Sequence, residues 1–322
     1  MDLLTAKWGA LAAPSGGEAV PLLVAAEDLA IGETMRYHAA KSFEEAAAIA
    51  EKAEGVTRFM AGGTDVLVQM RAGIVTPDDL IDLKHIAGVN DITRLEDGSW
   101  EIGVAVAGAR LGAHEALCAD WPGVVEGMEL VGSTQVQGRA TLTGNLCNGS
   151  PAADGVPGLV AAGAVAKIVG PSGSREVPIE EIPAGPGTTT LAKGEVIAAV
   201  RLPARGAGGG DAYQRFIPRT EMDIAVAGCA INLRVEGDTV TEARVAIGAV
   251  APTIRLVKDA ADAIIGSTLD DAALEALAAA VSAAASPISD KRGTTEFRTE
   301  VVGVLARRVA LVAYARAKGE KA

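Results

Sequence analysis

The sequence predicts an α+β fold with a mixed first part and a C-terminal part in which strands precede helices. Three observations lead to this prediction. Short strand and helix patterns alternate up to residue 203, a glycine-rich stretch occupies residues 204–211, and strand patterns then give way to helical ones. The 322 residues are enough for two domains, each with an apolar core of its own. Residues 1–35 follow no clear period, and we expect them to form an extension.

The segment after the extension predicts a small βαβ-like unit. Ser42 and Glu45 make a capping box for a helix that Gly55 ends. Residues 56–60 and 80–83 are short apolar runs typical of strands, and residues 65–71 predict a second helix between them, closed by Gly73.

The next segment predicts a hairpin, a group of helices and two further strands. Asp97 and Gly98 form a favourable turn between strands at 92–95 and 100–106. We expect helices at 110–117, 124–131 and 156–162, and strands at 166–169 and 195–202. Residues 204–211 predict a flexible break and are the best candidate for a domain boundary.

In the C-terminal third, the hydrophobic pattern changes once, from that of strands to that of helices. Residues 213–217, 224–233 and 244–250 predict a three-stranded antiparallel sheet, and residues 258–265, 271–284 and 295–318 predict helices. In the last helix Phe297, Val301, Leu305 and Val309 recur at the spacing of one apolar face. This third is therefore an α+β unit.

Composition and charge exclude several functions. Acidic residues number 41 against 29 basic ones, a net charge of −12 that argues against a nucleic-acid partner. Cys118, Cys147 and Cys229 form no CxxC pair, so we expect no iron–sulfur cluster, no zinc site and a reducing cytoplasm. No apolar run reaches the ~18 residues of a membrane span, and the start lacks the pattern of a secretory leader.

Two glycine-containing segments are the candidate ligand loops. In AGGTDVLVQM, residues 61–70, Gly62 and Gly63 leave the backbone amides bare just before a predicted helix. Thr64 can cap that helix, and the helix dipole adds positive potential, so the segment predicts an anion cradle without lysine. An ordinary Gly-Gly turn ahead of a surface helix is the alternative.

The second candidate loop spans residues 141–159, TLTGNLCNGSPAADGVPGL. It offers backbone amides and short polar side chains ahead of another predicted helix, and Asp154 either accepts from a sugar hydroxyl or caps that helix. Neither loop is a Walker A or a GxGxxG motif, so a P-loop or a Rossmann nicotinamide site is not supported. Two such cradles suggest a dinucleotide whose pyrophosphate is bound by backbone amides.

With these two loops, the chain resembles the FAD-binding medium subunits of the molybdenum hydroxylases, a family that includes carbon monoxide dehydrogenase and xanthine dehydrogenase. The resemblance spans about residues 36–317. Its motifs are AGGTDVLVQMRAG (61–73), LIDLKHIAGVNDI (80–92), ATLTGNLCNGSPAAD (140–154), GEVIAAVRLP (194–203), RFIPRTEMDIAV (215–226) and SDKRGTTEFR (289–298). It implies a PCMH/vanillyl-alcohol-oxidase-type FAD-binding domain at 36–205, with α/β subdomains at 36–90 and 91–205, and a C-terminal domain at 206–322.

The resemblance also implies which residues bind FAD, and it implies no catalytic residue or metal ligand in this chain. Three departures from the family pattern are Thr143 for a glycine, Gln137-Gly138 for Arg-Asn, and Val131 for an aromatic residue. The implied FAD contacts are Phe59, Met60, Ala61, Gly62, Gly63, Thr64, Asp65 and Val66 in the first loop, Thr141, Thr143, Gly144, Asn145, Ser150 and Asp154 in the second, and Ile197 and Arg215 beyond them.

By the same resemblance the chain is one subunit of a cytoplasmic heterotrimer and binds FAD noncovalently. An iron–sulfur small subunit would supply electrons, and a molybdopterin large subunit would oxidise the substrate. The FAD would then pass electrons to an acceptor such as NAD or a quinone. Two alternatives stay open: a stand-alone FAD-dependent oxidase or dehydrogenase, which the few His and Tyr residues disfavour, and a flavin-free structural subunit, which the departures at 137–138 and 143 allow.

Overall fold

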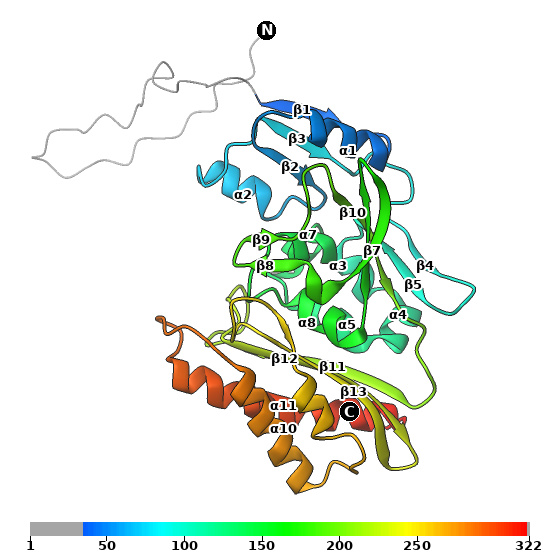
Figure 1. Cartoon of the computed structure of the whole chain (residues 1–322), viewed down its shortest axis with the longest axis vertical. Coiled ribbons are helices and arrows are strands. Elements are labelled where there is room, and N and C mark those ends of the chain that lie inside the picture. Colours follow the sequence, from blue (N-terminus) through cyan, green and yellow to red (C-terminus); the bar gives the residue numbers. More distant parts are fainter. Residues whose placement is uncertain (1–34, 321–322) are drawn as a thin grey trace, which may run out of the picture. The chain divides into compact units, whose positions relative to one another are not determined.

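A three-stranded parallel sheet begins the structure, a computed structural model that describes residues 35–320 (Figure 1). Its strands are β1 (Arg36–Ala39), β2 (Thr57–Met60) and β3 (Asp79–Asp82), in the order β1-β3-β2. Helix α1 (Phe43–Lys52) connects β1 to β2, and α2 (Val66–Arg71) connects β2 to β3. The expected βαβ-like unit is confirmed, with β1 as an added strand. Residues 1–34 of the predicted extension lie outside the described part.

The capping box predicted for α1 is present in a slightly altered form. Ser42 Oγ accepts from the Glu45 amide at 3.1 Å, while Glu45 Oε2 accepts from the amide of Lys41 at 2.7 Å, one residue before the cap. The same sequence spacing places Ala46 and Ala50 in an apolar cluster with Ile81 of β3, Val104 and Val196. This cluster joins the parallel sheet to the next part of the chain.

A five-stranded antiparallel sheet forms the next layer. Its order is β4-β5-β10-β6-β7, with β4 (Ile92–Arg94), β5 (Trp100–Gly103), β6 (Val165–Gly170), β7 (Gly173–Pro178) and β10 (Val196–Leu202). A separate ribbon pairs β8 (Pro183–Gly185) with β9 (Thr188–Thr189), after the 3₁₀ turn Ile179–Glu181. The edge strand β7 is mostly exposed and polar, which explains why no apolar alternation predicted it.

Six helices lie between β5 and β6 in the sequence: α3 (Gly108–Gly112), α4 (Glu115–Asp120), α5 (Pro122–Glu129), α6 (Thr134–Gln137), α7 (Leu142–Cys147) and α8 (Gly155–Ala162). The prediction of a single helix at 110–117 is wrong, because two separate helices, α3 and α4, cover this part of the chain. His114 Nδ1 accepts from the Leu117 amide at 3.2 Å and so starts α4 afresh. The strand expected at 100–106 ends at Gly103.

The C-terminal sheet has four antiparallel strands, in the order β11-β12-β13-β14. They are β11 (Gly209–Phe216), β12 (Ala227–Glu236), β13 (Thr239–Gly248) and β14 (Arg255–Leu256). The expectation of three strands missed β14, which is two residues long and exposed. The strand expected from residue 224 begins at Ala227, because Ile224 lies in the exposed loop before it.

Helices cover both faces of this sheet. Helix α11 (Thr295–Ala317) packs on β11 and β12, with α10 (Asp271–Ala284) beside it and α9 (Lys258–Asp262) beside α10, while α5 and α8 pack on the opposite face (Figure 1). Alternate residues of the strands accordingly enter two different apolar clusters: Tyr213 and Ala230 contact the α5–α8 side, and Ala212 and Ile231 contact the α10–α11 side.

The glycine-rich stretch at 204–211, which the sequence predicts to be a flexible break, is anchored in the structure at Arg205 and from Gly209 onward. The Arg205 guanidinium donates to the Asp120 carbonyl at 2.7 Å, pairs with Asp211 and stacks 3.7 Å from the Trp121 ring centroid. Strand β11 already begins at Gly209. The glycine-rich sequence does not predict these contacts, because Asp120 and Trp121, which Arg205 contacts, lie far from it in the chain.

Candidate functional site

A cavity of about 800 Å³ lies between the first two parts of the fold. Its wall combines the end of β2 and the following loop, the segment around α7, and residues 187–197 before and within β10. A space of this size is typical of sites for small organic cofactors. Most of the residues predicted to bind FAD line this one cavity: Phe59, Ala61, Gly62, Gly63, Thr64, Asp65, Val66, Thr141, Thr143, Gly144, Asn145 and Ile197.

The first glycine loop leaves its amides free. Within residues 35–320, none of the amides of residues 62–65 donates a hydrogen bond. Gly63 has φ +82°, a backbone conformation that glycine adopts without strain. Thr64 does not cap α2 as expected, since Asp65 holds the N-cap position and its side chain makes no capping bond. Burial raises the pKa of the Asp65 carboxyl.

Gly62 is required for a different contact from the one expected. A Cβ built on Gly62 would lie 2.0 Å from the carbonyl oxygen of Arg139, which is backbone and cannot step aside. The missing side chain therefore lets the first loop pack against the chain that leads into the second loop. The sequence predicts only that this bare surface faces a ligand.

The second loop begins with the short helix α7, which a hydroxyl group caps. Thr141 Oγ1 accepts from the amide of Gly144 at 3.0 Å, which fixes the start of the helix. Thr143 replaces the family's glycine without strain, because it lies in the helix, is buried, and donates its hydroxyl to the Val104 carbonyl at 2.7 Å. Asn145 Oδ1 accepts from the Gly155 amide at 2.9 Å and so connects the cavity wall to α8.

Four of the predicted residues lie outside the cavity lining. Met60 is buried at the end of β2, and Ser150 Oγ accepts locally from the Ala152 amide at 3.2 Å. Asp154 and Arg215 form a buried ion pair with each other, and Tyr213 donates to Asp154 at 2.7 Å. Asp154 stands at the N-cap position of α8 without a capping bond, so its carboxylate binds the C-terminal sheet instead.

Sequence reasoning missed two cations in the cavity wall. Arg58 of β2 and Lys193 of the turn before β10 both line the cavity, and neither forms an ion pair in the part of the chain that the structure describes. The two candidate loops contain no lysine, so the positive charge of the cavity wall comes from Arg58 and Lys193, which lie outside them. The only sequence signal was that Arg58 directly precedes the predicted FAD residue Phe59.

Cys147 also lines the cavity and its side chain is exposed there, whereas Cys229 is buried. The surrounding protein raises the pKa of the Cys147 thiol to about 12, because a thiolate would be poorly solvated in this wall. The cysteine is thus a neutral group at physiological pH.

Among residues 35–320, no cluster of three His, Cys, Asp or Glu side chains could hold a metal ion. In the same part of the chain, no helix has the length and apolar character to cross a bilayer.

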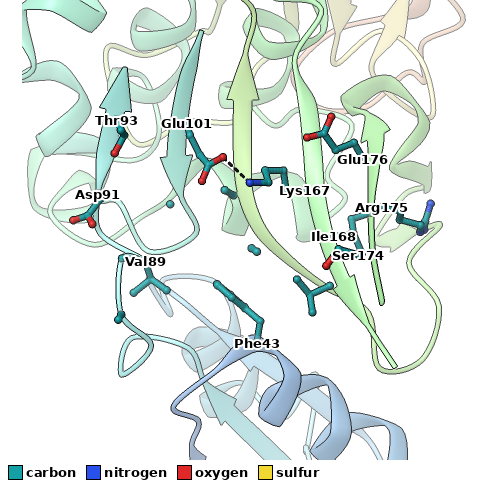
Figure 2. Close-up of a pocket in the computed structure, with 16 residues that line it drawn as sticks. Phe43, Val89, Asp91, Thr93, Glu101, Lys167, Ile168, Ser174, Arg175 and Glu176 are labelled. Atoms are coloured by element: carbon teal, nitrogen blue, oxygen red, sulfur yellow. Dashed lines mark hydrogen bonds and ion pairs between the residues drawn. The ribbon is translucent and has the colours of Figure 1, made fainter. Parts of the chain in front are cut away.

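A second cavity, of about 600 Å³, opens on the face of the five-stranded sheet (Figure 2). Phe43 stands at one end, and Lys167 of β6 pairs with Glu101 of β5 at 2.7 Å, across the intervening strand β10. Arg175 in the same wall is paired with Glu195 at 2.7 Å. No residue lines both cavities, and the cations of this one are already neutralised. An anionic dinucleotide is therefore better matched to the first cavity.

Comparisons with known proteins show which family the chain is similar to. Residues 33–205 match the family described as the FAD binding domain in molybdopterin dehydrogenase, and residues 212–313 match the CO dehydrogenase flavoprotein C-terminal domain. The chain is 33% identical to the carbon monoxide dehydrogenase medium chain of Afipia carboxidovorans over 283 residues, covering 88% of this chain and 97% of the relative.

Two further similarities extend across most of the chain. The xanthine dehydrogenase FAD-binding subunit of Escherichia coli O157:H7 is 30% identical over 264 residues, covering 82% of this chain and 90% of the relative. A carbon monoxide dehydrogenase structure from Hydrogenophaga pseudoflava superposes with a TM-score of 0.84 at 33% identity, covering 88% and 98% of the two chains. With its domain content, its amide-lined cavity and these relatives, the chain belongs to the FAD-binding subunits of the molybdenum hydroxylase family.

Proposed function

We propose that this chain is the electron-transfer subunit of a molybdopterin-dependent dehydrogenase. Electrons would arrive from the clusters of an iron–sulfur partner subunit and leave to an acceptor such as NAD or a quinone. A large molybdopterin subunit would oxidise the substrate. The observation that carries this proposal is the convergence of both glycine-containing loops on one cavity whose first loop has free amides. The relatives' names, medium chain and FAD-binding subunit, support it.

The chain's own residues have distinct tasks in this proposal. The amides of residues 62–65 bind the pyrophosphate, and Arg58 and Lys193 add positive charge to the same wall. Val131, Leu191 and Ile197 supply apolar surface for the ring systems. Bound FAD supplies the electron relay, and the protein supplies its position and surroundings. Asp154 and Arg215 act from outside the cavity wall, through Asn145 and α8.

The lining favours electron transfer over a stand-alone oxidase. Its described residues include neither His nor Tyr, the side chains most suited to proton transfer with an organic substrate. The free amides of the first loop, in turn, disfavour a purely structural subunit. We also propose the domain boundaries expected above, 36–205 and 206–322, and a cytoplasmic location, which the three free cysteines support.

A two-step experiment tests this function with the full chain. The FAD-free protein is first mixed with FAD, and we expect a flavin spectrum that is released on denaturation. The loaded protein is then reduced photochemically and mixed with NAD or a soluble quinone, and we expect the flavin absorbance to return. Failure to take up FAD would contradict the proposal. Turnover of alcohols or aldehydes by the isolated chain would favour the oxidase instead.

A further inference from the structure

Arg139 contacts the first glycine loop from outside the cavity. Its Nε donates to the carbonyl oxygen of Gly62 at 3.0 Å, across 77 positions of sequence. Arg139 is not among the residues that line the cavity, whereas Gly62 is. In the described part of the chain Arg139 forms no ion pair, so the Gly62 carbonyl is its one side-chain partner.

The Arg139 backbone contacts Gly62 as well. The position of a Gly62 Cβ is 2.0 Å from the Arg139 carbonyl oxygen and 3.2 Å from Cα of Ala140, a cavity residue. Gly62 is therefore packed on one side by the Arg139 backbone and bonded through its carbonyl to the Arg139 side chain. These two contacts together fix the orientation of the Gly62–Gly63 peptide group, in which the Gly62 carbonyl points toward Arg139.

The direction of this peptide group decides which charge the loop presents. In a trans peptide the carbonyl and the following amide point in opposite directions, and the described chain has no cis peptide bond. Because the Gly62 carbonyl points to Arg139, the Gly63 amide points away from Arg139, and it donates no hydrogen bond within residues 35–320. A reversed peptide would offer a carbonyl oxygen where an anion needs an amide.

Gly62 and Gly63 make such a reversal easy in the absence of a restraint. A peptide group between two glycines can turn over at low cost, because neither residue has a Cβ to restrict φ and ψ. Gly63 already has φ +82°. A hydrogen bond from a guanidinium to a carbonyl is charge-assisted, and it selects the orientation in which that carbonyl faces Arg139.

A second contact holds the same two segments together at the cavity. Gln69 of α2 donates from Nε2 to Oδ1 of Asn148, which follows α7, at 3.0 Å, and both residues line the cavity. The first loop is thus held at Gly62 by Arg139, just before the second loop, and at Gln69 by Asn148 within it. This arrangement fixes the spacing of the loops and leaves the peptide orientation to Arg139.

We propose that Arg139 is a positioning residue that locks the Gly62–Gly63 peptide with its amide available to the phosphate groups of FAD. The inference rests on the proposed FAD site. Arg139 contributes no contact to the cofactor itself. It acts by keeping the apoprotein in the binding-competent orientation, and the apparent affinity falls in proportion when that orientation is less populated.

The test compares Arg139→Ala and Arg139→Lys with Arg110→Ala, all in the full chain. Arg110 is a matched control, because it also donates to a backbone carbonyl, that of Asn90 at 2.6 Å, but away from the cavity. Dissociation constants of FAD are measured by fluorescence on FAD-free protein, together with the melting temperatures. We expect Arg139→Ala to raise the dissociation constant by about tenfold, the scale of one charge-assisted hydrogen bond.

We further expect Arg139→Lys to recover most of the affinity, since an ammonium can donate to the same carbonyl, and Arg110→Ala to bind as the wild type. The melting temperatures of Arg139→Ala and Arg110→Ala without FAD should agree. The inference is overturned if Arg139→Ala binds FAD as the wild type does, if lysine restores nothing, or if the affinity falls only as the melting temperature falls. Failure of the wild type to bind FAD would instead contradict the proposed function.

Discussion

The carboxylate of Asp154 and the guanidinium of Arg215 form an ion pair whose side chains are only 8% and 4% exposed. The pair joins the start of α8 to β11 of the C-terminal sheet, and Tyr213 donates a third contact to Asp154 at 2.7 Å. Burial raises the pKa of Asp154 to about 6, and the charge of Arg215 opposes that effect. The ion pair therefore connects α8 to the C-terminal sheet, and loss of either partner would leave the other charge buried without a counter-charge.

Arg215→Met should destabilise the protein by about 3–5 kcal/mol near neutral pH, because it leaves the Asp154 carboxylate buried without a counter-charge. Since the pKa of Asp154 is raised in the folded state, its contribution to stability is present at acid pH and lost as the pH rises through about 6. The loss in Arg215→Met should accordingly be smaller at about pH 5 than at about pH 8. Urea unfolding at both values measures it.

Arg219→Met is the control for that experiment. Arg219 pairs with Asp223 at 3.1 Å, but its side chain is 68% exposed, so its removal should lower the free energy of unfolding far less than Arg215→Met does. Equal losses in the two variants, or a loss in Arg215→Met that does not change with pH, would contradict the account of the buried pair.

Asp79→Asn should show the opposite dependence on pH. Asp79 of β3 accepts from Arg36 at 2.6 and 2.8 Å and pairs with His38 at 2.7 Å, and the Arg36 hydrogen bonds, with those of His38, lower the pKa of Asp79 to about 2. A lowered folded-state pKa gives stability that is present above about pH 4 and lost as the pH falls toward about 2. The stability difference between wild type and Asp79→Asn should shrink over that range. A difference independent of pH would exclude this role.

Most of the fold could be predicted from local sequence patterns, and the misses have physical causes. The helix over 271–284 was predicted with its bounds, because Asp270 caps it and its apolar residues recur at helical spacing. Strand β7 was missed because an exposed edge strand needs no apolar alternation. The break between α3 and α4 was missed because it depends on the His114 side chain, which the helical pattern around it conceals.

The candidate site was predicted less completely than the fold. The two loops were found because bare glycines and capping residues are visible in the sequence, and they line one cavity. Lys193 was missed because a ligand wall is assembled from distant segments. Arg58 and Gln69 lie beside and within the first loop, but no pattern in the sequence shows that their side chains face the cavity. The contact of Asp154 and Arg215 with FAD stays a prediction. Sequence alone could not show that these two oppositely charged residues, 61 positions apart, are paired with each other.

Gly62→Ala should weaken FAD binding strongly. The new methyl group would need space that the Arg139 carbonyl occupies at 2.0 Å, and such overpacking costs about 1–3 kcal/mol. If the loop moves away to relieve it, the binding arrangement is disfavoured by that amount, which is about five- to 150-fold in affinity. Gly206→Ala is the matched control, because an added Cβ there meets nothing within 4 Å. Equilibrium titration with FAD measures both. Unchanged affinity in Gly62→Ala would show that the first loop is not packed as described.

Cys147 should report on whether the cavity is filled. Cys147 is an exposed residue of the cavity wall, whereas Cys229 is buried, so a maleimide should label Cys147 in FAD-free protein. The labelling should be slow, because burial of the thiol raises its pKa to about 12. With FAD at about 100 times its dissociation constant, labelling should slow by about a hundredfold. Mass spectrometry identifies the site, and Cys147→Ser provides the blank. Labelling at the same rate with and without FAD would place the cofactor elsewhere.

A crystal structure of the FAD-loaded chain is the most direct test of the site. The account predicts cofactor density in the cavity, with the pyrophosphate against the amides of residues 62–65 and the remainder between the first loop, α7 and the segment at 187–197. Density for FAD on the face of the five-stranded sheet, or a pyrophosphate beyond hydrogen-bonding reach of those amides, would contradict it.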